Sequence, residues 1–115
     1  MNPGEVVLVE LPQIGGGLPK LRPALFLASL PGPYQNILIC GISTRLEQVE
    51  ADWDEMISTD DSDFKSSGLH RDSIIRLSYL YASDFLELEG RIGRIDSSRL
   101  DRLRMRLSKH LRTPE

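Results

Sequence analysis

The chain contains few side chains suited to proton transfer near neutral pH. Its two histidines are His70, just before a segment rich in β-branched residues, and His110, near the C-terminus. Because only histidine normally titrates near neutral pH, His70 is the conventional acid–base candidate. As a lone histidine it also fits an exposed loop residue, and nothing in the sequence pairs it with His110. The single cysteine, Cys40, excludes an internal disulfide and a cysteine-rich metal site, and we expect neither a metal nor another cofactor.

Two tyrosines, Tyr79 and Tyr81, lie two residues apart in a segment that is predicted to be a strand. This spacing puts both rings on the same face of a sheet. Aromatic rings on a sheet can stack unpaired nucleobases, each worth about 1–3 kcal/mol. The alternative is ordinary packing in the wall of a barrel, and the spacing leaves both interpretations open.

Charged residues are unevenly distributed along the chain, whose net charge is −3. Eight of the 17 acidic residues lie between Glu47 and Asp63, a stretch without Lys or Arg. This leaves nine acidic side chains to face all 14 basic ones elsewhere in the chain. Such a distribution fits a basic face for an anionic ligand, and it equally fits a solvated acidic loop beside an ordinary surface.

Stretches rich in apolar and β-branched residues predict strands over most of the chain. The second and third strands are apolar on both faces, as expected of central strands in a closed sheet. Residues 51–57 fit a polar edge strand that carries Trp53, and residues 86–95 fit a short, bent strand with two glycines. The predicted strands cover residues 4–11, 22–30, 37–44, 51–57, 73–81 and 86–95.

The connecting segments are recognised by glycine and proline. Three consecutive glycines, Gly15–Gly17, predict a flexible loop over residues 12–20, between the first two strands. Residues 31–33, Pro-Gly-Pro, predict a turn. Residues 60–67 fit a loop or one short helical turn.

The C-terminal segment changes to a helical period. Four leucines, Leu100, Leu103, Leu107 and Leu111, fall on one side, and Asp96 or Ser97 can cap the first turn. We expect this leucine stripe to dock on the sheet, and the basic side either stays solvated or also contacts a partner or RNA. The basic side comprises Arg99, Arg102, Arg104, Arg106, Lys109 and Arg112.

These elements predict a mainly β fold with a C-terminal α-helix, in a single domain of residues 1–115. Strands this short often close into a small barrel. No apolar run approaches the roughly 20 residues of a membrane helix. The N-terminus lacks a basic region followed by an apolar stretch, so we expect a cytoplasmic protein.

The order and spacing of the segments resemble the MazF/PemK family of type II toxin–antitoxin systems over nearly the whole chain. Each motif is weak by itself, but six in the same order are much stronger. The matching motifs are GEVVLVEL at 4–11, the glycine-containing loop at 12–20, RPALFLAS at 22–29, GIST at 41–44, GLHRDSII at 68–75, and IGRI at 92–95 before the helix.

The resemblance implies a small SH3-like β-barrel that forms a homodimer. It also implies metal-independent cleavage of single-stranded mRNA and a cognate antitoxin that blocks the site. It places the active-site arginine at Arg22 and the active-site hydroxyl at Ser43, followed by Thr44. Near this site, Lys20 and Arg45 are expected to contact phosphates, or alternatively to be solvated charges at strand ends. The RNA-binding residues expected in total are Lys20, Arg45, His70, Tyr79 and Tyr81.

The residue types suit that chemistry. Metal-free RNA cleavage uses the ribose 2′-hydroxyl to attack the neighbouring phosphate, so an enzyme must orient the attack and stabilise charge on the phosphate oxygens. The planar guanidinium of Arg22 can bind a phosphate through two hydrogen bonds, and Ser43 or Thr44 can donate a third. Because arginine has an unperturbed pKa of about 12.5 or higher, electrostatic stabilisation suits Arg22 better than the acid–base part that the family suggests.

Three departures from the family pattern leave alternatives open. Ser43 stands where the family usually has Thr, Gly41 replaces a proline, and Tyr79 and Tyr81 replace a Gln-x-Arg pair. The missing pair favours a non-catalytic barrel that binds a partner peptide or nucleic acid. A third possibility is a toxin of the same fold that acts on DNA gyrase, as CcdB relatives do, with the C-terminal helix making the contact. Arg22 beside Ser43 favours the nuclease.

Overall fold

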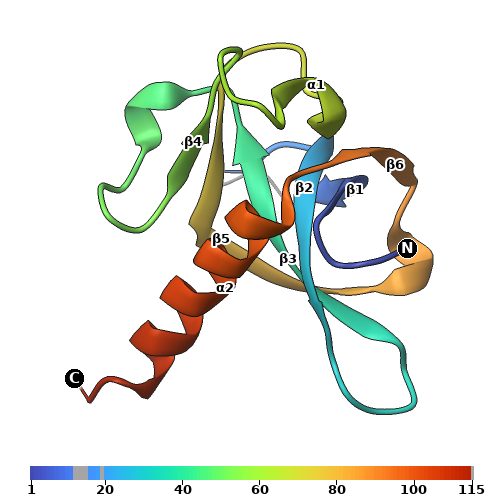
Figure 1. The fold of residues 1–115 in the computed structure, drawn as a ribbon. Coiled ribbons are helices and arrows are strands. Elements are labelled where there is room, and N and C mark those ends of the chain that lie inside the picture. Colours follow the sequence, from blue (N-terminus) through green and yellow to red (C-terminus); the bar gives the residue numbers. More distant parts are fainter. Residues whose placement is uncertain (12–15, 19, 115) are drawn as a thin grey trace.

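The computed structural model describes residues 1–11, 16–18 and 20–114, and the statements below concern these residues. One antiparallel sheet of six strands has the order β4-β5-β3-β2-β1-β6 and curls into a partial barrel (Figure 1). The strands are β1 (Glu5–Leu11), β2 (Lys20–Ser29), β3 (Asn36–Ser43), β4 (Glu55–Ile57), β5 (Ser73–Asp84) and β6 (Gly90–Arg94). The helices are η1 (Leu46–Gln48), α1 (Phe64–Ser67), η2 (Phe85–Glu87) and α2 (Ser97–Arg112). The predicted fold class, mainly β with a C-terminal α-helix, is confirmed.

Most predicted strands are present, but two of them are shorter than expected. The edge strand over residues 51–57 is reduced to β4, and Trp53 lies in the turn before it. The turn forms because the N–H groups of Trp53 and Asp54 both donate to the carbonyl of Glu50, while Asp54 accepts from the Glu50 N–H. These local bonds compete with strand pairing.

The predicted strand over residues 86–95 is interrupted at its start. Residues 85–87 form the short helix η2, because the side chain of Asp84 accepts a hydrogen bond from the N–H of Leu86. The predicted loop over residues 12–20 lies partly outside the described residues, and Lys20 already belongs to β2.

The sheet has two different faces. On the helix face, Leu100, Leu103 and Leu107 of α2 pack into a core with side chains from β1 to β5. On the opposite face, which we call the tyrosine face, Tyr79 and Tyr81 pack against a second apolar cluster. That cluster consists of Val7, Val9, Ala24, Phe26, Ile37 and Ile39.

Helix α2 confirms the helical prediction and corrects its details. Three of the four leucines are buried, but Leu111 is 73% exposed because the C-terminal end of the helix extends past the sheet (Figure 1). Asp96 occupies the N-cap position, although its side chain makes no capping hydrogen bond. Burial of each leucine contributes about 1.5–3 kcal/mol, which is enough to hold the helix on the sheet.

The short helix α1 packs directly on the edge strand β6. A Cβ atom added to Gly68, which has a φ of 77°, would lie 2.2 Å from the carbonyl oxygen of Ile92. A Cβ atom on Gly93 would lie equally close, 2.2 Å, to the carbonyl oxygen of Ser66. Both positions therefore require glycine. Gly68 belongs to the GLHRDSII motif and Gly93 to the IGRI motif.

Candidate functional site

Strand pairing determines which face of the sheet carries Arg22 and Ser43. Arg22 on β2 is paired directly with Val9, which belongs to the cluster on the tyrosine face. Ser43 lies four residues after Ile39, another member of that cluster, on the same strand β3. Because side chains alternate along a strand and paired residues share a face, Arg22 and Ser43 both lie on the tyrosine face.

The register of β2 and β3 also relates the two residues. The last pair of these strands on this side is Ala24 and Gly41, and continuing the same register by two residues would set Arg22 opposite Ser43. Directly opposed side chains have Cβ atoms about 4.5–5.5 Å apart. Arg22 is exposed and Ser43 is partly exposed, so an anion from solvent can reach both.

The hydroxyl of Ser43 has a defined orientation. Its oxygen accepts a hydrogen bond of 3.1 Å from the N–H of Arg45, which lies just after β3. A hydroxyl that accepts one bond still has its own proton to donate. Ser43 can therefore act as a donor to an oxyanion without losing the contact that holds it.

A second guanidinium, that of Arg76 on β5, lies on the same face, although the sequence alone did not predict it there. Arg76 is paired directly with Gly41 and is therefore a diagonal neighbour of Ser43, at a usual Cβ separation of about 7–8 Å. Its terminal nitrogens donate to Gln48 at 3.3 Å and to Ser78 at 3.4 Å. Its Nε is buried without a hydrogen-bond partner among the described residues. The signal in the sequence was a charged residue inside the apolar run at residues 74–77.

The two tyrosines lie side by side on this face, as their spacing predicts. Both are partly buried against the apolar cluster, so the packing interpretation holds for part of each ring. A Cβ atom on Gly41 would lie 3.6 Å from Cγ of Tyr79, which means that the tyrosine is seated over the glycine backbone. Tyr79 is thus next to Gly41, which lies on β3 between Ser43 and Ile39 of the apolar cluster.

An irregularity in β5 brings Tyr79 to this position. The pairing with β3 jumps from Arg76 opposite Gly41 to Leu80 opposite Cys40. As a result, Leu77 packs on the helix face while Tyr79 packs on the tyrosine face.

The buried carboxylate of Asp54 stabilises this irregularity in β5. It accepts hydrogen bonds from the N–H of Ser78 at 3.0 Å and from the Ser78 hydroxyl at 2.9 Å. These bonds satisfy a backbone group that the strand pairing leaves out.

The remaining predicted residues lie around or away from this site. Lys20 begins β2 and shares the alternation of Arg22, while Thr44 and Arg45 follow the end of β3, and all three are exposed. His70 is exposed in the loop between α1 and β5.

A protein-family model described as PemK-like, MazF-like toxin of type II toxin–antitoxin system matches residues 2–111. The chain belongs to this family. No curated protein matches the chain. Membership implies that this PemK-like toxin has a cognate antitoxin as a partner.

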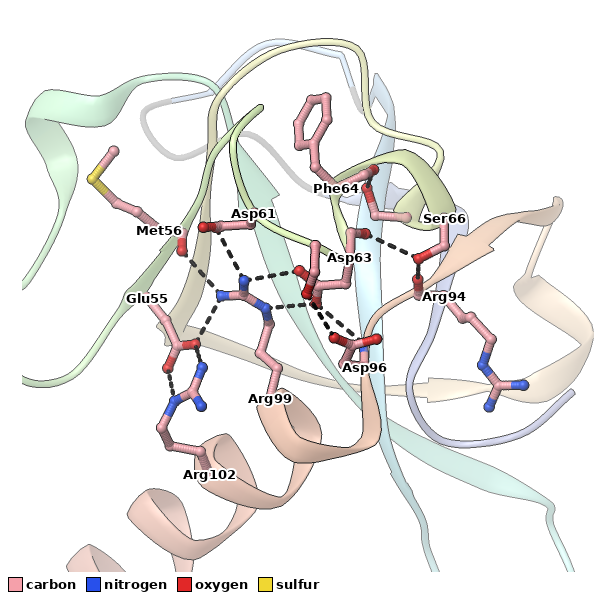
Figure 2. A network of polar contacts seen from close by, with 12 residues as sticks. Glu55, Met56, Asp61, Asp63, Phe64, Ser66, Arg94, Asp96, Arg99 and Arg102 are labelled. Carbon is pink, nitrogen blue, oxygen red and sulfur yellow. Dashed lines mark hydrogen bonds and ion pairs between the residues drawn. The ribbon is translucent and has the colours of Figure 1, made fainter.

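The uneven charges of the PemK-like toxin form a network between α2 and residues 55–63, which comprise β4 and the segment before α1 (Figure 2). Arg99 is only 8% exposed and binds Asp63 through two hydrogen bonds, of 2.8 and 3.0 Å. It also donates to Glu55 at 2.8 Å and to Asp61 at 3.1 Å. Arg102 and Arg106 bind Glu55 as well.

The network explains part of the charge pattern. Three of the helix cations neutralise the acidic segment, and Arg99, assigned above to the basic side, is buried because these carboxylates surround it. Hydrogen bonding from Arg99 holds the pKa of Asp63 below its ordinary value. Burial raises the pKa of Glu55, but the bonds and charges of the three arginines outweigh it and lower the pKa overall.

Within the described residues, no group of three or more His, Cys, Asp or Glu side chains is placed to hold a metal ion. In the same part of the chain, no helix has the length and apolar character needed to cross a membrane.

Proposed function

We propose that this toxin is a metal-independent endoribonuclease that cleaves single-stranded mRNA in the cytoplasm. The observation that carries the proposal is the placement of Arg22 and Ser43 on one face of the adjacent strands β2 and β3. Family membership supports it. A guanidinium and a hydroxyl on the same face of adjacent strands can bind the same phosphate group.

In the proposed reaction the ribose 2′-hydroxyl attacks the adjacent phosphorus. The 2′-hydroxyl loses its proton to solvent, the bond to the 5′-oxygen of the next nucleotide breaks, and this oxygen takes up a proton from solvent, which leaves a 2′,3′-cyclic phosphate and a 5′-hydroxyl. Arg22 binds the non-bridging oxygens and stabilises the negative charge that they gain in the transition state. Ser43, or Thr44 beside it, donates a hydrogen bond to the same group, and Arg76 supplies a second positive charge.

The surroundings of the site suit an RNA strand and a protein inhibitor. Lys20 and Arg45 are exposed near the ends of β2 and β3, where they can contact neighbouring phosphates. His70 lies further along the chain, in the loop that leads into β5. We propose that the toxin is a homodimer, and that the cognate antitoxin inhibits it by covering this face.

The test is cleavage of a long single-stranded RNA in the presence of EDTA. The unmodified toxin should give discrete fragments whose 5′ ends are phosphorylated directly by a polynucleotide kinase, because they carry hydroxyls. Arg22→Ala should give none, while Arg104→Ala, which removes an exposed arginine from α2, should cleave normally. Cleavage by Arg22→Ala at the normal rate would refute the proposed role of Arg22.

A second function is favoured by one observation, the replacement of the Gln-x-Arg pair by two tyrosines on the tyrosine face. A barrel that binds nucleic acid without cutting it can use such rings to stack bases. Intact RNA together with measurable binding in the same experiment would favour this function over the nuclease.

A further inference from the structure

The aromatic ring of Tyr79 packs on the backbone of Gly41, and Arg22 and Arg76 lie on the same face of the sheet. We propose that Tyr79 is a stacking platform for an unpaired nucleobase next to the phosphate site, so that the toxin binds single-stranded nucleic acid whichever sugar it carries. The location of the bound phosphate in this inference rests on the proposed function.

The glycine under the ring gives Tyr79 its place. Cβ and Cδ1 of Tyr79 would both lie 3.7 Å from a Cβ atom on Gly41, which is ordinary van der Waals contact. Gly41 is paired with Ala24 on one side and with Arg76 on the other. The ring therefore packs over β3, which lies between β2 with Arg22 and β5 with Arg76.

The platform is also held in position. Tyr79 follows Ser78, whose N–H and hydroxyl both bind the buried carboxylate of Asp54. On its other side Tyr81 is paired with Ile39, which is fully buried. A tyrosine on such a support loses little conformational freedom when a base stacks on it, because only two side-chain torsions are involved.

Stacking has a consequence for the ligand class. Every nucleobase has an aromatic face, so stacking tolerates many sequences and does not read the 2′-hydroxyl. The 2′-hydroxyl is needed only as the nucleophile of cleavage. Single-stranded DNA should therefore bind at the same site, remain uncut and inhibit cleavage of RNA.

Fluorescence anisotropy with a labelled single-stranded DNA, and with an uncleaved short RNA of the same sequence, tests this inference at low salt. Tyr79→Leu should weaken binding of both strands at least about 5-fold, the lower end of what one stacked base contributes. Tyr79→Phe keeps the ring and should bind normally. Tyr34→Leu, which removes an exposed tyrosine from the β2–β3 turn, is the matched control and should have no effect.

The outcomes separate the platform from the nuclease. Normal DNA binding by a folded Tyr79→Leu variant would overturn the inference, and so would RNA binding without DNA binding. If the toxin cuts no RNA but binds DNA through Tyr79, the nuclease proposal fails and the platform stands. If RNA is cut and Tyr79→Leu leaves KM unchanged, the platform fails and the nuclease stands.

Discussion

Arg99 and Arg22 are the same residue type in opposite environments. Arg99 is 8% exposed, and all three of its nitrogens bind acceptors from β4 and the segment before α1 (Figure 2). Arg22 is exposed on the tyrosine face, where its direct pairing partner, Val9, is apolar. A buried guanidinium whose donors are used by carboxylates stabilises the fold, whereas an exposed one on an apolar face can offer its donors to a ligand.

Arg76 is an intermediate case that sharpens the comparison. It is partly buried, but its two hydrogen bonds are long, at 3.3 and 3.4 Å, and neither acceptor is charged. Its buried Nε has no partner among the described residues. Because a buried donor without a partner costs about 1–3 kcal/mol, binding of an anion at this guanidinium would recover part of that cost.

The largest expected effect on stability comes from Arg99→Ala. The variant leaves Asp63 and Glu55 charged and poorly solvated, which should lower the free energy of unfolding by about 3–5 kcal/mol. Urea denaturation followed by circular dichroism measures it. Arg22→Ala should change the same quantity by less than about 0.5 kcal/mol, as expected of an exposed residue. Equal losses for the two variants would remove the distinction between the two arginines.

Arg22→Ala, which should change stability little, should strongly lower activity. Loss of a group that stabilises charge in the transition state typically lowers kcat by about 100- to 1000-fold. Arg22→Lys should recover little of this rate, because an ammonium cannot form the paired hydrogen bonds of a guanidinium. Initial rates on a short fluorescent RNA measure both variants, and a fully active Arg22→Lys would show that charge alone suffices.

The fold was largely predictable because local patterns decide it. Runs of β-branched residues marked the long strands, and the leucine period marked α2 up to Leu107. The errors at Trp53 and Leu86 have one cause, a carboxylate that captures nearby backbone N–H groups and makes a turn instead of a strand. Asp54 and Asp84 gave no periodic signal, so the pattern of apolar residues missed them.

The candidate site was only partly predictable, because long-range pairing decides it. The alternation of side chains within one strand predicts that Tyr79 and Tyr81 share a face. It cannot predict that Arg76 lies opposite Gly41, because that pairing depends on the register between β3 and β5. The burial of Arg99 was missed for the same reason, since its carboxylate partners lie 36 or more residues away in sequence. A count of charges cannot distinguish a paired cation from a free one.

Acid should weaken the Arg99 network. Hydrogen bonding from Arg99 lowers the pKa of Asp63, and the three arginines lower that of Glu55 against the opposing effect of burial. The stability from these carboxylates is therefore complete above their unfolded pKa values of about 4, and is lost as pH falls through the lower folded values.

Urea midpoints between pH 7 and pH 2 measure this loss. The unmodified protein should lose more stability over this range than Arg99→Leu, in which Asp63 has lost its main partner and Glu55 has lost one of its three arginines. Parallel pH profiles of the two proteins would show that the network does not hold these groups in their charged form.

The smallest expected effect on stability is that of Arg102→Ala, and it tests whether the burial of an ion pair, rather than its mere presence, determines its contribution. Arg102 also binds Glu55, but its side chain is 51% exposed, so water screens the pair. Arg102→Ala should therefore lower the free energy of unfolding by only about 0.2–1 kcal/mol. A loss as large as that of Arg99→Ala would mean that the number of ion pairs, and not their burial, determines how an arginine stabilises this fold. High salt provides the control, because it should weaken the Arg102 pair more than the buried pairs of Arg99.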